Sequence, residues 1–195
     1  MSETRTGIVS RKTKETEVNV TLDLDGSGVS WISTGQPFFD HMLQLFSKHS
    51  SFNLEITARG DLAVDGHHTV EDAGMCLGRA LVRALGEKQG INRFGSAVVP
   101  MDDALVMAVV DLSGRSYLAF EAQMTSPRLG DFDTELIEEF MRSFAANGGF
   151  NLHIRQLAGK NTHHIIEATF KALALAMKQA TAITGEGIPS TKGVL

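Results

Sequence analysis

Residues 67–71 read HHTVE and residues 163–167 read HHIIE, and each pentapeptide opens a long amphipathic segment. After the first copy, apolar residues recur at intervals of three and four up to about residue 88, and after the second they do so up to residue 181. This spacing puts the apolar side chains on one face of a helix. The sequence therefore predicts two long helices, over residues 68–88 and 162–181, each beginning at a pair of histidines.

The segment before each histidine pair is repeated as well. FNL occurs at residues 52–54 and again at residues 150–152, in the same order relative to HHxxE. Chance rarely supplies both motifs twice at nearly the same spacing, so we interpret the chain as a duplication. We expect a single domain of two similar halves, about 6–95 and 96–185, followed by a turn-rich tail, 186–195. The expected fold is an α/β (α+β) sandwich in which helices cover one face of the sheet.

Shorter elements fill the rest of each half. Residues 15–24 alternate polar and apolar side chains, which is typical of a half-buried strand. DGSG at 25–28, followed by an apolar return at 29–32, predicts a hairpin. Further strands are expected at 52–58, 96–99, 104–112, 116–122 and 150–156, and further helices at 38–48 and 133–145. The tail is expected to be mobile unless other residues hold it.

Composition excludes several classes of protein. The chain has 195 residues and a net charge of −5, which argues against a nucleic-acid-binding face that relies on bulk positive charge. No apolar run is long enough for a membrane helix, and the first residues lack the apolar core of a secretory signal. Cys76 is the only cysteine, which excludes an intramolecular disulfide and fits a reducing cytosol. We therefore expect a cytoplasmic protein.

The histidine pairs have the spacing of metal ligands. On a helix, His67 and Glu71 are four residues apart and share a face, whereas His68 points about 100° away and can reach a second cation. The same holds for the second copy, His163, His164 and Glu167, and further ligands can come from His41 and His153. Imidazole and carboxylate donors without thiolate suit Mn, Fe or Zn. The alternative is that the histidines merely cap helices or lie exposed at their starts.

A second group of residues has the character of an anion site. Arginine, lysine and hydroxyl side chains stand on loops beside glycine, and such groups bind phosphate oxygens. These residues are Arg93, Arg115, Ser190 and Lys192. Each could also be an ordinary solvated surface group. His49 has a similar alternative, as a cation at a helix end.

Motifs over nearly the whole chain resemble those of the imidazoleglycerol-phosphate dehydratase family, in its monofunctional form. The matching strings are RKTKET (11–16), PFFDHML (37–43), GDLAVDGHHTVED (60–72), RFG (93–95), PMDDA (100–104), DLSGR (111–115), NTHHIIEATFKAL (161–173) and STKG (190–193). Ser116 departs from the proline expected in many relatives. The resemblance implies two half-domains of the ribosomal protein S5 domain 2-like type, and a 24-subunit homo-oligomer with active sites shared between subunits.

The resemblance also implies two Mn²⁺ ions in each active site. The ligands of one ion would be His41, His67, Glu71 and His164, and those of the other His68, His153, His163 and Glu167. The substrate, a phosphorylated imidazole, would be bound by Glu15, Gln44, His49, Arg93, Arg115, Lys171, Ser190 and Lys192. The tail would then close over the bound substrate as a lid.

The implied reaction is dehydration of D-erythro-imidazole glycerol phosphate to imidazole acetol phosphate in histidine biosynthesis. A metal-bound imidazolate would expel the hydroxyl to give a diazafulvene, and a carboxylate would remove the neighbouring proton. Glu15 is the first candidate for this carboxylate, and Glu71 or Glu167 could share the role. Asp102 and Asp103 are further candidates for the site or its surroundings. The alternatives are a di-metal phosphate hydrolase and a metal-storage or metal-sensing protein.

Overall fold

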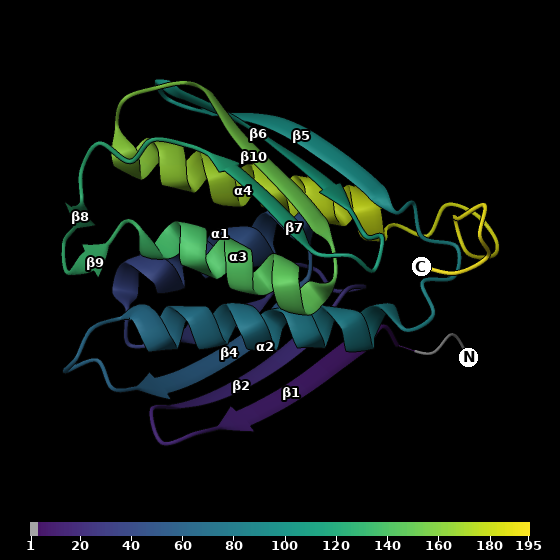
Figure 1. The fold of residues 1–195 in the computed structure, drawn as a ribbon, viewed down its shortest axis with the longest axis horizontal. Helices are drawn as coiled ribbons and strands as arrows, with labels where there is room; N and C mark the ends of the chain where they lie inside the picture. The colour runs from purple at the N-terminus through teal and green to yellow at the C-terminus, as the bar shows by residue number, and fades with distance from the viewer. Residues whose placement is uncertain (1–3) are drawn as a thin grey trace.

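Two halves with the same succession of elements make up the computed structural model, which describes residues 4–195 (Figure 1). The first half contains β1 (Thr6–Lys12), β2 (Thr16–Asp23), β3 (Ser30–Ser33), α1 (Pro37–Ser50), β4 (Asn53–Gly60) and α2 (His67–Leu85). The second contains β5 (Phe94–Met101), β6 (Ala104–Asp111), β7 (Tyr117–Glu121), β8 (Arg128–Leu129), β9 (Phe132–Asp133), α3 (Leu136–Gly148), β10 (Asn151–Ala158) and α4 (Thr162–Thr181). Among these described residues, no helix is both long and apolar enough to cross a membrane.

Each half forms a four-stranded sheet, and the two sheets have the same strand order. The orders are β1-β2-β4-β3 and β5-β6-β10-β7, and the last pair of each sheet, β3 with β4 and β7 with β10, is parallel. A parallel pair requires a crossover, which α1 provides in the first half and α3 in the second. The duplication expected from the repeated HHxxE and FNL motifs is therefore confirmed. The small β8–β9 hairpin is an addition to the second half.

The hairpin predicted at residues 25–32 is wrong. β3 does form, but it pairs with β4 and not with β2, because β4 lies between them. The turn at 25–28 is bound to the start of β4, where the side chain of Asn53 accepts the backbone N–H groups of Ser27 and Val29, both at 3.0 Å. The turn residues thus lead the chain past the position that β4 later fills.

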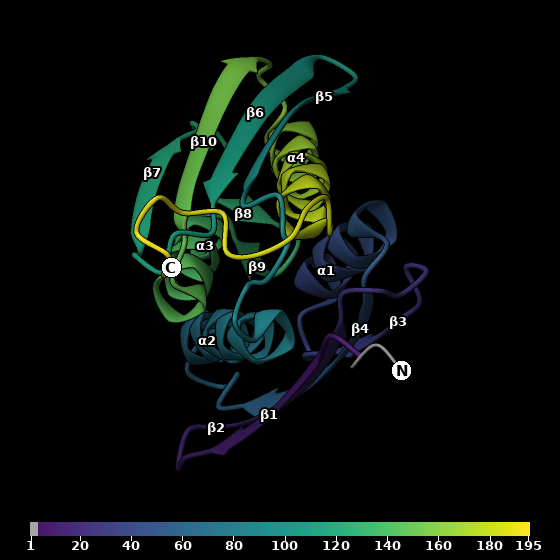
Figure 2. The ribbon, with the colours of Figure 1, turned by 90° about the vertical axis from the view of Figure 1, so that its right-hand side faces the viewer.

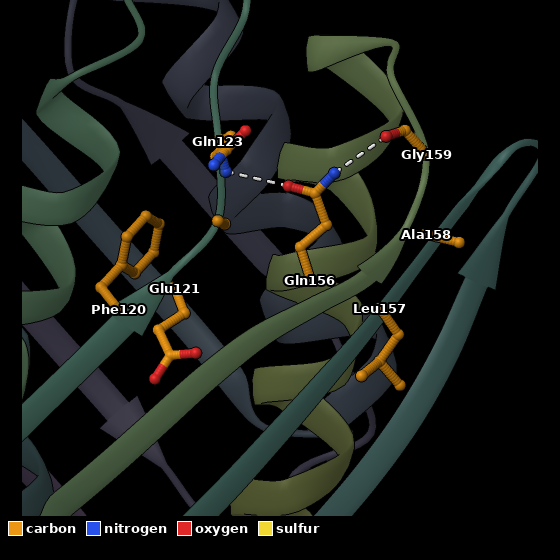
Figure 3. Close-up of a pocket in the computed structure, with 8 residues that line it drawn as sticks. Phe120, Glu121, Gln123, Gln156, Leu157, Ala158 and Gly159 are labelled. Carbon is orange, nitrogen blue, oxygen red and sulfur yellow. Dashed lines mark hydrogen bonds between the residues drawn. The ribbon is translucent and has the colours of Figure 1, made fainter.

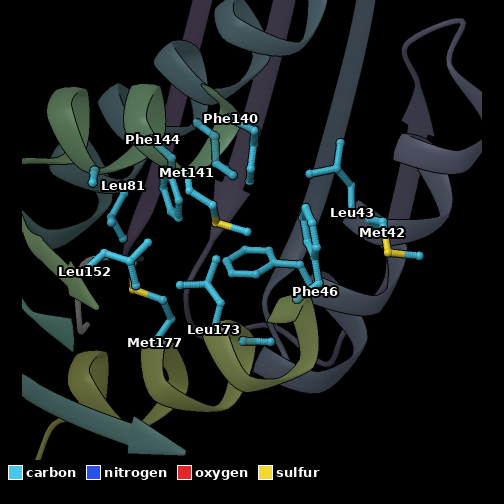
Figure 4. Close-up of a cluster of buried hydrophobic side chains, with 14 of the residues drawn as sticks. Met42, Leu43, Phe46, Leu81, Phe140, Met141, Phe144, Leu152, Leu173 and Met177 are labelled. Atoms are coloured by element: carbon cyan, nitrogen blue, oxygen red, sulfur yellow. The ribbon is translucent and has the colours of Figure 1, made fainter. Parts of the chain in front are cut away.

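The helices lie between the two sheets, so each sheet has one covered and one outer face (Figures 1 and 2). α2 packs on β1 and β2, and α4 packs on β5 and β6. The helices also pack across the two halves, α2 against α3 and α1 against α4. Aromatic and aliphatic side chains from both halves meet between them, with the rings of Phe46 and Phe144 6.0 Å apart (Figure 4). One continuous core therefore joins the duplicated halves.

Glycine lets the edge strand of each half approach its long helix. A Cβ at Gly7 in β1 would lie 1.9 Å from the carbonyl oxygen of Ala80 in α2, and one at Gly95 in β5 would lie 1.9 Å from that of Ala176 in α4. Both contacts are closer than any side chain permits. The two glycines occupy matching places in the duplicated sheets.

Candidate active site

Both long helices begin at the same side of the molecule, on the left in Figure 1. At the start of α4, the side chain of Asn161 accepts the backbone N–H groups of His163 and His164, at 2.9 and 3.3 Å. At the start of α2, Asp65 accepts the N–H of His67 at 2.8 Å. These caps satisfy backbone groups that a helix leaves unpaired and fix each histidine pair on the first turn.

A first polar group lies between α1 and α4. The His163 Nε2 and Glu167 Oε2 atoms are 3.4 Å apart, and Lys171 Nζ lies 2.6 Å from Glu167 Oε1. Burial opposes ionisation of Glu167, but the charges of Lys171, His163 and the nearby His41 hold its pKa below 4.5. The carboxylate is therefore ionised at neutral pH. His49 on α1 is half-buried nearby, and this burial, followed by the charge of Lys171, lowers its pKa.

A second polar group surrounds His68 at the start of α2. Its Nδ1 atom lies 3.1 Å from both carboxylate oxygens of Asp61, which follows β4. The hydrogen bond to Asp61 raises the pKa of His68, and the negative charges of Glu15 and Asp65 add to the effect. Glu15 stands in the β1–β2 turn, next to Thr16, and Thr16 pairs with Gly60 at the end of β4, directly before Asp61. The predicted acid–base carboxylate is therefore carried by a turn beside the Asp61–His68 pair.

His164 is held in the same way by a carboxylate from the β5–β6 turn. Its Nδ1 atom lies 2.7 Å from Asp103 Oδ1, and its Nε2 atom lies 3.4 Å from Asp102 Oδ2. The backbone N–H of Lys160, followed by the imidazole of His164, lowers the pKa of Asp103 to about 2. In both halves, then, a carboxylate binds Nδ1 of the second histidine of the pair, which leaves Nε2 as the nitrogen available for a metal.

Other predicted site residues lie elsewhere. His153 is on the outer face of the second sheet, where its ring lies 5.5 Å from that of Tyr117. Glu71 is half-buried on α2, and Gln44 is exposed on α1. Within residues 4–195, no three His, Cys, Asp or Glu side chains converge as a metal site. One chain therefore presents the predicted ligands in separate groups.

The four predicted phosphate-binding residues line one cavity of about 310 Å³, beyond the end of α4. Arg115 and Lys192 are exposed there and Ser190 is half-buried. Arg93 instead forms a bidentate ion pair with Asp111, at 2.7 and 3.2 Å, and donates to the carbonyl of Pro189 at 3.0 Å. The tail is also held by a hydrogen bond from Gly90 N–H to the Gly187 carbonyl. Arg93 thus anchors the segment that carries Ser190 and Lys192.

Comparison with known proteins identifies the family. A family model described as imidazoleglycerol-phosphate dehydratase matches residues 34–177. The chain is 71% identical to the imidazoleglycerol-phosphate dehydratase of Pelotomaculum thermopropionicum, with all of both chains covered. It is 62% identical to that of Desulforudis audaxviator, with 96% of both covered. The chain belongs to the imidazoleglycerol-phosphate dehydratase family. It is therefore an enzyme, a hydro-lyase of histidine biosynthesis.

Solved dehydratase structures have the same fold. The Staphylococcus aureus enzyme aligns with a TM-score of 0.84 at 40% identity, covering 92% of this chain and 99% of that one. The Pyrococcus furiosus enzyme, in complex with (S)-C348, aligns with a TM-score of 0.84 at 40% identity, covering 96% and 100%. The expected α/β fold of duplicated halves is thus confirmed at both levels, sequence and structure.

In this dehydratase the imidazoles and the anion cavity lie at opposite ends of one helix. α4 has 20 residues and spans about 30 Å. His163 and His164 stand at its start, and the tail with Ser190 and Lys192 follows its end, on the right in Figure 1. A substrate of the size of a sugar phosphate cannot reach both ends of the same chain.

Another cavity of the dehydratase, of about 610 Å³, contains none of the predicted site residues. It lies beside the ends of β7 and β10, where Gln156 accepts the N–H of Gln123 and donates to the carbonyl of Gly159 (Figure 3). Sequence reasoning misses Asp61, which does bind a predicted ligand. The signal that could have found it is its place in GDLAVDGHH, a few residues before the histidine pair.

Proposed function

We propose that this chain converts D-erythro-imidazole glycerol phosphate to imidazole acetol phosphate, with two Mn²⁺ ions in each active site. The observation that carries the proposal is the combination of two imidazole–carboxylate groups with a cavity lined by Arg93, Arg115, Ser190 and Lys192. Full-length identity of 71% to a protein named for this dehydratase activity supports it. We propose a cytoplasmic location for the enzyme.

The donor set fits manganese. The available donors are imidazole nitrogens and carboxylate oxygens, whereas the thiol of Cys76 is buried in the core. His163 and Glu167 are close enough for one cation to bind both. The residues that would hold the two ions are His41, His67, His68, Glu71, His153, His163, His164 and Glu167. When bound, the ions would supply Lewis-acid charge that lowers the pKa of an imidazole N–H group.

Separate sets of residues would bind the phosphate and the rest of the substrate, and a carboxylate would move a proton. Arg115, Lys192 and Ser190 would bind the phosphate oxygens. Gln44 and His49 on α1 and Lys171 on α4 would orient the rest of the substrate. Arg93 would act mainly by holding the tail against the cavity. The closed tail would keep bulk water away from the reacting carbons.

Glu15 would be the base that takes the proton from the carbon next to the departing hydroxyl. Overall, one C–H bond and one C–O bond break, water leaves, and the resulting enol tautomerises to the ketone. The place of Glu15 in a turn beside Asp61 and its charge effect on His68 support this role. Glu71 and Glu167 remain alternatives, although Glu167 is paired with both His163 and Lys171.

We propose that complete active sites form between subunits of a homo-oligomer, a 24-mer by resemblance to the family. The separation of the imidazole groups from the anion cavity along α4 supports sharing. The outer sheet faces carry exposed apolar side chains, among them Ile8, Trp31, Val98 and Tyr117. Contiguous exposed apolar surface is typical of subunit interfaces.

The decisive experiment incubates the manganese-loaded protein with imidazole glycerol phosphate. The proposal requires a ketone product and no release of inorganic phosphate. Phosphate release would instead indicate a di-metal hydrolase, and bound metal without turnover would indicate storage or sensing. Metal analysis and the mass of the assembly, measured on the same preparation, test the manganese content and the subunit number.

A further inference from the structure

Asp72 follows Glu71 on α2, yet its side chain is bound to the β1–β2 hairpin. The residue is 7% exposed. Its Oδ2 atom accepts hydrogen bonds from Arg11 Nη1 at the end of β1 and from Thr16 Oγ1 at the start of β2. Arg11 Nη1 also lies 3.4 Å from Thr16 Oγ1. A buried carboxylate with a guanidinium and a hydroxyl partner forms a specific and rigid connection.

The same network fixes the turn that carries Glu15. The hydroxyl of Thr13 accepts the N–H groups of Glu15 and Thr16, at 3.2 and 3.0 Å. The N–H of Thr13 donates to the carbonyl of Thr16 at 2.8 Å, and the two threonine hydroxyls lie 3.3 Å apart. Thr16 is therefore at once the closing residue of the turn and the partner of Asp72. Glu15 is exposed between these two threonines.

The second half of the molecule lacks this connection. In the repeat, Ala168 of α4 stands where Asp72 stands in α2, one residue after the glutamate of HHxxE. The β5–β6 turn is instead connected to α4 through Asp103 and His164. The carboxylate–threonine connection therefore occurs in the half whose turn carries Glu15. Because both halves have the same strand order, the fold itself does not require this connection.

We propose that Asp72 is a positioning residue that holds the Glu15 turn against α2, so that the Glu15 carboxylate stays at a fixed place beside His68. The proposal rests on the proposed acid–base role of Glu15. Asp72 acts through Thr16 and does not touch the substrate. Arg11 and Thr16 of RKTKET and Asp72 of HHTVED thereby have a role other than metal binding.

The test compares Asp72→Asn, Thr16→Val and Thr16→Ser in the manganese-loaded assembly. Asp72→Asn and Thr16→Val should lower kcat about 10- to 100-fold, because a small displacement of a catalytic group has an effect of this size. KM and manganese content should stay within twofold of wild type, and Thr16→Ser, which keeps the hydroxyl, should restore kcat. Asp25→Asn is the matched control, because it removes an Arg5–Asp25 ion pair at the other end of the hairpin. That control should leave kcat unchanged.

A double-mutant cycle with Glu15→Gln decides whether Asp72 acts through Glu15. In the Glu15→Gln background, Asp72→Asn should cause no further loss of kcat. An equal loss in both backgrounds, or a loss of manganese or of substrate affinity, would overturn the positioning role alone. A Glu15→Gln variant with full kcat would overturn it together with the acid–base role of Glu15. If Asp72→Asn does not fold, the kcat values of Thr16→Val and Thr16→Ser, measured in both backgrounds, test the same positioning role.

Discussion

At the scale of single residues, a carboxylate on Nδ1 determines which nitrogen of a histidine can bind a metal. Asp61 and Asp103 do this for His68 and His164 from different places in the fold, one after β4 and one in the β5–β6 turn. A carboxylate bonded to Nδ1 favours the proton on that nitrogen, so Nε2 is the nitrogen that a metal can bind. The HHxxE motifs could be predicted from the sequence, and so could Asp103 as a residue of the site or its surroundings. Asp61, and which carboxylate binds which histidine, could not, because the approach of each loop depends on the folded chain.

Asp61→Ala should weaken manganese binding about 10- to 100-fold, because the His68 ring loses the acceptor that orients it. Isothermal titration calorimetry with MnCl₂ measures the change. Asp65→Asn is the control, since it removes a nearby charge while an asparagine oxygen can still accept the His67 N–H. Equal weakening in both variants would attribute the effect to charge alone.

Manganese binding should also depend on pH through His68. The bond to Asp61 raises the pKa of His68 above 6.5, so protons compete with the metal up to a higher pH than they do at a free imidazole. Affinity should therefore fall as the pH drops through this raised value. In Asp61→Ala the fall should shift to lower pH, and the same titration repeated across pH checks it. An unchanged pH profile would disprove the coupling.

Arg115→Ala and Lys192→Ala should each raise KM about 10- to 100-fold, since a charged hydrogen bond contributes about 1.5–3 kcal/mol. Steady-state kinetics should show little change in kcat. Arg93→Ala should raise KM and also lower the melting temperature, because Arg93 binds both Asp111 and the Pro189 carbonyl. Lys178→Ala, which removes a surface bond to Ser51, serves as the control. Wild-type KM in both Arg115→Ala and Lys192→Ala would refute the phosphate site.

At the scale of elements, periodicity is informative where an element is long and one face is buried. Apolar spacing predicts α2 and α4 closely, and alternation predicts β2, with Val18, Val20 and Leu22 facing the helices. β1 was not predicted, because Ile8 and Val9 are its only large apolar residues. The partner of β3 depends on β4, which follows 20 residues later, so local turn residues could not determine it.

Gly7→Ala and Gly95→Ala should each destabilise the fold by about 1–3 kcal/mol, because the new methyl group overlaps a helix carbonyl. Calorimetry should show a fall in Tm of about 2–4 °C for each kcal/mol. Gly185→Ala, whose new Cβ meets nothing within 4 Å, should leave Tm almost unchanged. Similar Tm values for all three variants would show that the strands can move away from the helices at little cost.

At the scale of the whole molecule, the duplication produces one core but not one active site. The helices of the two halves pack against each other, α1 with α4 and α2 with α3. The histidine pair of α4 and the cavity predicted to bind phosphate lie at opposite ends of that helix. The resemblance of RKTKET, HHTVED and STKG to the family predicted a set of candidate site residues. It could not give their distribution over one chain, because which residues of the folded chain come close depends on how the strands and helices pack; His153, for example, lies on the outer face of the second sheet and Glu167 on α4.

Subunits with complementary defects should restore activity when mixed. A chain with Glu167→Gln and a chain with Arg115→Ala and Lys192→Ala should each be almost inactive. Dissociated, mixed equally and reassembled, they should regain roughly a quarter of wild-type activity if each site takes its metal end and its cavity from two different chains. Product formation before and after mixing measures this. No recovery in a correctly assembled mixture would mean that each chain holds its own complete site.

The length of α4 has a consequence for how the reaction is switched on. If complete sites form between subunits, as proposed, a freshly synthesised chain carries two unmatched fragments of different catalytic centres, one at each end of that helix. On the proposed sharing of active sites, turnover would begin only when subunits assemble, so at low protein concentration the rate would rise more steeply than the concentration. Dilution alone would then inactivate the enzyme, without any inhibitor.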